Sequence, residues 1–108
     1  MKENSKEIER RRSILAYLHH CLIGEVPKKL RLVSVDWTQD TACLHFYFDG
    51  EIEERDHETV DLVHTYFVAN FTEDNMRSCG LDIVRIDEPL PIPYEGECVF
   101  ARKEKYDN

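Results

Sequence analysis

Apolar residues recur at helical spacing in two parts of the chain. In the first part the apolar positions are followed by a glycine and a proline: Ile8, Leu15, Leu18, Leu22, Gly24 and Pro27. In the second part the spacing is the same: Val60, Val63, Phe67 and Phe71. This spacing predicts one helix over residues 5–23 and a second helix that is capped by Asp56 and ends near Asn70.

Elsewhere apolar and polar side chains alternate, as they do in strands with one buried face. Residues 30–37 and 42–48 are two such runs around a polar turn, so they predict an antiparallel hairpin. One face of this hairpin is apolar: Val33, Val35, Trp37, Ala42, Leu44, Phe46 and Phe48. The other face is mixed: Leu32, Ser34, Asp36, Cys43, His45, Tyr47 and Asp49.

Two shorter strands are predicted at residues 81–86 and 98–101. Three prolines stand between them, and they predict an extended connection at a sheet edge: Pro89, Pro91 and Pro93. The order of elements is therefore helix, strand, strand, helix, strand, strand. This order predicts a single α+β domain with a mainly antiparallel sheet of about four strands, both helices packed against it, an ordered core over residues 5–103 and a frayed tail from Arg102.

Composition supports one folded domain in the cytoplasm. Hydrophobic residues make up 42% of the 108 residues, which is enough for one modest core. No apolar stretch approaches the roughly 20 residues that cross a bilayer, and the charged N-terminus does not resemble an export signal. We therefore expect no membrane partner, and free buried thiols for the four cysteines. Two disulfides would instead indicate a secreted protein.

The net charge is -8, which disfavours DNA or RNA as a direct ligand and favours a basic partner. The acidic residues concentrate in one segment, where only Arg55 opposes them: Asp49, Glu51, Glu53, Glu54, Asp56, Glu58 and Asp61. One interpretation is a solvated helix entrance that complements the helix dipole. The other is a surface for a basic protein, with these partner-binding candidates: Asp49, Glu51, Glu53, Glu54, Asp56, Glu58 and the aromatic Tyr47.

Metal, cofactor and catalytic residues are not expected. No two cysteines have the spacing of a structural zinc site, and no phosphate-binding loop or nucleophile elbow is present. Cys43, His45 and Asp36 could meet across the hairpin as a nucleophile with its base, but their register is open. We expect His64 to be hydrogen-bonded at the margin of the core and His57 to be exposed.

Three strings of residues carry a resemblance to a known class of proteins. They are residues 33–37 (VSVDW), 46–51 (FYFDGE) and 83–89 (IVRIDEP), followed by Gly96 and a short terminal strand. This pattern, over about residues 26–103, resembles small bacterial immunity proteins of contact-dependent growth inhibition systems. The resemblance implies a cytoplasmic protein that binds the toxic domain of a delivered effector, often a nuclease, and blocks its active site.

The sequence therefore predicts an immunity protein that neutralises a cognate toxin domain by forming a stoichiometric complex. The basic surface of a nuclease-type toxin would match the acidic excess. Two alternatives stay open. One is a small adaptor or subunit of a larger assembly, and the other is a small hydrolase that uses His45 with Cys43 or His57.

Overall fold

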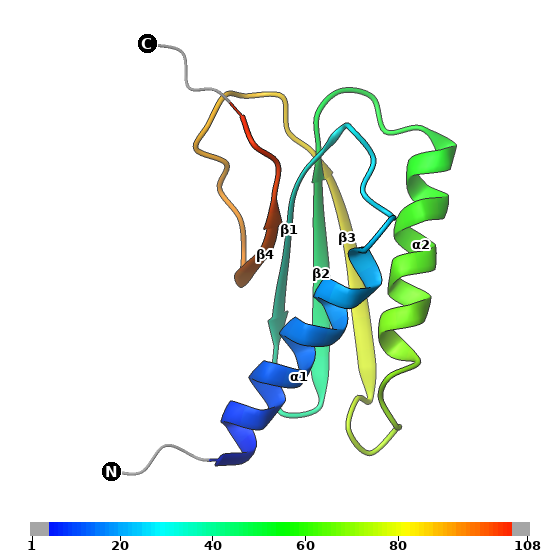
Figure 1. The fold of residues 1–108 in the computed structure, drawn as a ribbon, viewed down its shortest axis with the longest axis vertical. Helices are drawn as coiled ribbons and strands as arrows, with labels where there is room; N and C mark the ends of the chain where they lie inside the picture. Colours follow the sequence, from blue (N-terminus) through cyan, green and yellow to red (C-terminus); the bar gives the residue numbers. More distant parts are fainter. Residues whose placement is uncertain (1–4, 105–108) are drawn as a thin grey trace.

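The computed structural model describes residues 5–104 and has the predicted order of elements (Figure 1). The elements are α1 (Ser5–Leu22), β1 (Leu30–Trp37), β2 (Thr41–Phe48), α2 (Glu54–Val68), β3 (Ser78–Arg85) and β4 (Glu97–Ala101). The α+β class is confirmed. The N-cap of α2 differs from the predicted Asp56. The helix begins at Glu54 with Glu53 as its N-cap, and Asp56 lies inside the first turn.

The four strands form one sheet in the order β3-β2-β1-β4. β1 is antiparallel to both β2 and β4, and β2 is parallel to β3. The parallel pair arises because α2 carries the chain back along the sheet between β2 and β3, and a helix is the usual crossover between parallel strands. The sheet is thus mainly antiparallel, as predicted.

Both helices pack against one face of the sheet, as Figure 1 shows. This inner face carries the apolar set of the predicted hairpin, and Val33, Val35, Leu44 and Phe48 are at most 1% exposed. The helices contribute the fully buried side chains Ile14, Leu18, Val60, Val63 and Phe67. The sheet therefore has one side closed by helices, and its other side, the outer face, is available for other contacts.

The segment between β3 and β4 covers part of the outer face. Ile92 packs there on Leu32 and Tyr47, and all three are at most 7% exposed. The prediction that the proline-rich connection lies at a sheet edge is therefore wrong. β3 and β4 are the two opposite edges of the sheet, so the chain between them has to cross its outer face.

The end of the described chain is tied down rather than frayed. Arg31 in β1 donates two hydrogen bonds to Glu104, and Arg102 donates a third. The Arg31 guanidinium also donates to the backbone carbonyls of Ile86 and Glu88. The prediction of a frayed tail is wrong for residues 102–104, and its remainder, residues 105–108, lies outside the described residues.

All four cysteines are free thiols, as predicted. Cys21 is buried, Cys43 and Cys79 are half-buried, and Cys98 is exposed, so the expectation of burial fails for Cys98. Among residues 5–104 no helix has the length and apolar character to cross a bilayer.

Candidate functional site

Asp56 is the exception in the acidic segment, because its side chain is buried. It is 3% exposed, and its carboxylate accepts the backbone N–H of Glu53 at 2.9 Å. The Lys29 ammonium lies 3.0 Å from the same carboxylate. Burial alone would raise the pKa of Asp56, but these hydrogen bonds and the charge of Lys29 lower it. Asp56 therefore stabilises the first turn of α2, and its burial does not support it as a contact residue.

Two further acidic candidates have cationic partners within the molecule. Lys29 pairs with Glu53 at 3.0 Å, and Arg102 pairs with Asp49 at 3.3 Å. Both carboxylates remain about half exposed. Since a paired carboxylate has less charge to offer a partner, these two contribute less to an acidic surface than their sequence suggests.

Within the acidic segment, the residues that form no ion pair lie on one face of α2 and just before it. Glu51, Glu54 and Glu58 are exposed, and the ion pairs of residues 5–104 include none of them. Glu54, Glu58 and Asp61 follow one another at i, i+4 and i+7, so they share one helix face. Two exposed apolar side chains flank it: Leu62, 38% exposed, and Tyr66, 52% exposed. We call Glu54, Glu58, Asp61, Leu62 and Tyr66 the α2 surface.

Tyr47 does not belong to an exposed surface. It is 5% exposed under the segment between β3 and β4, and its hydroxyl oxygen accepts the backbone N–H of Glu95 at 3.3 Å. The alternation of β2 correctly predicts that Tyr47 faces away from the helices. It gives no sign of the segment that covers this face, and the burial does not support Tyr47 as a contact residue.

A second group of titratable side chains gathers on the outer face of the sheet around His45. This imidazole is 4% exposed and comes from β2, while Asp36 and Asp82 come from the strands on either side. Its Nε2 lies 2.5 Å from an Asp36 carboxylate oxygen, and its Nδ1 lies 3.1 Å from one of Asp82. Both ring nitrogens are therefore occupied by carboxylates.

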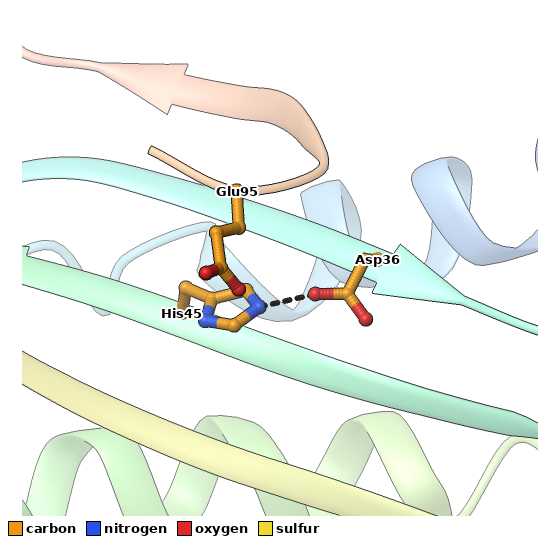
Figure 2. A group of neighbouring side chains, drawn as sticks. All are labelled: Asp36, His45 and Glu95. Carbon is orange, nitrogen blue, oxygen red and sulfur yellow. Dashed lines mark hydrogen bonds and ion pairs between the residues drawn. The ribbon is translucent and has the colours of Figure 1, made fainter. Parts of the chain in front are cut away.

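Glu95 completes this group from the segment that precedes β4. Figure 2 shows its carboxylate over the His45 ring. One ligand atom from each of Asp36, His45 and Glu95 lies within 4.8 Å of the other two. Gly96 makes this position accessible, because its φ is +80° and a Cβ there would collide with the Val35 carbonyl oxygen.

The geometry does not support Cys43 and His45 as a nucleophile with its base. Burial raises the pKa of the Cys43 thiol, and the charges of Asp36, Asp82 and Glu95 raise it further. An activated cysteine needs the opposite shift, toward the thiolate. Neither nitrogen of His45 is directed to the sulfur, since Asp36 and Asp82 hold both.

The other histidines lie where the sequence places them. His57 is exposed near the start of α2, and the half-buried His64 shares a hydrogen bond of 2.9 Å with the Cys79 carbonyl. The approach of Asp82 and Glu95 to His45 was not predicted from the sequence. Asp82 left a weak signal, because it is the acidic residue of β3, whereas Glu95 left none.

Comparison with known proteins gives one result. A family model described as MafI2 immunity protein matches residues 11–104, which is most of the chain. A search of curated proteins finds no match. The family match confirms the predicted resemblance to small immunity proteins of toxin and immunity systems.

Proposed function

The chain belongs to the MafI2 immunity protein family, and on this premise we propose that it neutralises a cognate toxin domain by binding it in a stoichiometric complex. It does so in the cytoplasm and performs no chemistry of its own. The toxin is delivered by cell contact and has a basic, nuclease-type surface. The net charge of -8 supports a basic partner, because opposite fields speed the encounter of two proteins.

The α2 surface together with Glu51 is the proposed contact site. The observation that carries this assignment is the lack of any ion pair for Glu51, Glu54 and Glu58 among residues 5–104. Their charge remains available for lysines or arginines of the toxin. Leu62 and Tyr66 add exposed apolar area beside these charges, and tyrosine is enriched among the residues that dominate binding energies.

A charge-reversal experiment tests this site. The triple variant Glu51→Lys, Glu54→Lys and Glu58→Lys should bind the toxin domain with a slower association rate, because steering attraction becomes repulsion. Raising the salt concentration should slow association of the unmodified protein and speed that of the variant. Surface-based kinetics at two ionic strengths measure both effects, and growth of cells that produce the toxin reports protection.

A matched control carries the same charge change elsewhere. The variant Glu73→Lys, Asp74→Lys and Glu88→Lys alters three exposed acids outside the α2 surface. It should retain most of the association rate and protect cells. If both triple variants bind alike, the α2 surface is not the contact site. If the purified chain binds no toxin domain encoded beside it and confers no protection, the immunity function itself is rejected.

A further inference from the structure

We propose that Asp36, His45 and Glu95 bind a divalent transition-metal ion, with Zn²⁺ as the ion that fits them best. This site lies on the outer face of the sheet, away from the helices, and is independent of toxin binding. Its basis is the convergence of one imidazole and two carboxylates from β1, β2 and the segment before β4 (Figure 2).

The surroundings of His45 fit a metal-bound imidazole. Nδ1 shares a hydrogen bond with Asp82, and Nε2 shares one with Asp36. With the proton of the first bond on Nδ1, Nε2 would be free to bind an ion beside Asp36 and Glu95. Histidines that bind metals usually donate their other ring N–H to a carboxylate or carbonyl, which fixes the tautomer and the ring orientation. Asp82 would therefore orient His45 without touching the ion.

The charges of the group call for a cation. Carboxylates of Asp36 and Asp82 lie at hydrogen-bond distance from the two ring nitrogens of His45. A second ring proton would satisfy both contacts. It would leave Glu95 uncompensated, since the ion pairs of residues 5–104 include none for Glu95. A divalent ion placed between the three groups neutralises both carboxylates and uses the Nε2 lone pair.

A buried hydroxyl without a hydrogen-bond partner supports the site independently. Ser34 is fully buried, and its Oγ has no hydrogen-bond partner among the described residues. It is paired with His45 across the antiparallel strands, and both side chains are on the outer face. Cβ atoms of such pairs lie about 5 Å apart, so the hydroxyl is next to the imidazole. An ion with a bound water would supply the missing partner.

The ligand set selects the class of ion. Imidazole nitrogen suits Zn²⁺ and its neighbours in the first transition series, whereas Mg²⁺ and Ca²⁺ prefer oxygen ligands alone. Ligands of tetrahedral zinc lie about 3.5 Å apart, so the groups must move by about 1 Å. The carboxylate of Asp36 is about half exposed and Glu95 is exposed, so both have room to do so. Three protein ligands leave the fourth position to water.

Such an ion would hold the connection between β3 and β4 on the sheet. Glu95 belongs to this connection, whereas Asp36 and His45 belong to the two central strands. Metal binding should therefore stabilise the fold and protect the backbone amides near residue 95 from hydrogen exchange.

Calorimetry on the full chain, first stripped with a chelator, tests the proposal. Addition of Zn²⁺ should show one ion per chain and raise the melting temperature. Glu95→Gln should weaken Zn²⁺ binding about tenfold or more. Asp82→Asn should weaken it by about ten to a hundred times, the usual loss for a residue that orients a ligand. Co²⁺ should give the visible absorption of a tetrahedral site, and His45→Gln should abolish it.

Two matched controls show whether these losses are specific. His57→Gln and Glu73→Gln remove an exposed histidine and an exposed glutamate elsewhere, and both should bind Zn²⁺ as the unmodified chain does. Because Glu95 is exposed, Glu95→Gln should keep its fold even if His45→Gln does not. Absence of Zn²⁺ binding by the unmodified chain, or binding that survives Glu95→Gln, would overturn the proposal. His45 would then be held only by its hydrogen bonds to the neighbouring carboxylates. Toxin binding enters none of these measurements.

Discussion

The guanidinium of Arg31 meets the carboxylate of Glu104 through two hydrogen bonds of 2.9 and 2.7 Å, and this pair joins β1 to the end of the described chain. Arg31 is only 3% exposed. A buried guanidinium keeps its charge, so it depends on this partner more than a surface arginine would.

Removal of Glu104 should therefore destabilise the protein. Glu104→Ala leaves Arg31 buried with only carbonyl partners, and we expect the free energy of unfolding to fall by about 3 kcal/mol. Urea denaturation measures this loss. Glu97→Ala is the matched control, because it removes an exposed ion pair with Arg11 that should contribute at most about 1 kcal/mol. Equal losses in the two variants would mean that Glu104 is not a structural partner.

Asp56 should make stability depend on pH in the acid range. Its pKa is lowered in the folded protein, so its contribution is complete above its unfolded pKa of about 3.9 and disappears as the pH falls through the folded value. At neutral pH, Asp56→Ala should cost about 1–2 kcal/mol of unfolding free energy.

The cost of Asp56→Ala should shrink toward zero in strong acid, where the native carboxyl is protonated. Chemical denaturation of both proteins over a series of pH values gives the difference directly. Asp61→Ala, on the exposed side of the same helix, should show little cost at any pH. A cost for Asp56→Ala that does not change with pH would contradict a role for the charge.

Alanine substitutions at two glycines should distinguish the cost of backbone strain from the cost of a steric clash. Gly24 and Gly96 both have φ of +80°, a conformation that costs a residue with a Cβ about 1–2 kcal/mol. A Cβ at Gly24 meets nothing within 4 Å, whereas one at Gly96 would meet the Val35 carbonyl. Gly96→Ala should therefore cost about 3 kcal/mol or more and Gly24→Ala about half of that, as measured by denaturation. Similar costs would show that the backbone near Gly96 can withdraw from β1.

Substitutions of two adjacent residues of α2 should have different effects, one on the stability of the fold and the other on toxin binding. Phe67 is fully buried and Tyr66 is 52% exposed. Phe67→Ala should lower the free energy of unfolding by about 3–5 kcal/mol, whereas Tyr66→Ala should change it little. Tyr66→Ala should weaken toxin binding by more than about 1 kcal/mol if it anchors the contact. Denaturation and equilibrium binding measure the two effects, and unchanged toxin binding would remove Tyr66 from the α2 surface.

The sequence predicts the hairpin well because period-two alternation assigns the side chains of β1 and β2 to a face from Leu32 onward. A register shift between Leu30 and Leu32 breaks the alternation and places Leu30 in the inner core. Val35 and Leu44 lie under the helices and Asp36 and His45 lie on the outer face, as the pattern indicates. The same pattern cannot show what covers the outer face. Tyr47 is predicted on the correct side and is nevertheless buried, because the covering segment depends on β3 and β4 being opposite edges.

The sequence predicts the acidic segment less well, because a run of acidic residues does not show which carboxylates form ion pairs in the fold. Asp56 and Glu58 are acidic residues two positions apart, yet Asp56 is buried beside Lys29 and Glu58 is exposed. The lysine lies before β1, and only the fold brings it to the start of α2. In the same way, the parallel register of β2 and β3 places Asp82 beside His45.

The strand order has a consequence for shortened chains. β1 is an inner strand, and its neighbour β4 follows β3 along the chain. A polypeptide that stops after β3 could still build the hairpin, α2 and the parallel pair, including the whole α2 surface. Its β1 would then present an unpaired edge, and Leu32 and Tyr47 would lose their cover. Exposed strand edges with apolar neighbours promote aggregation, so a premature stop between β3 and β4 should yield insoluble protein rather than a smaller active one.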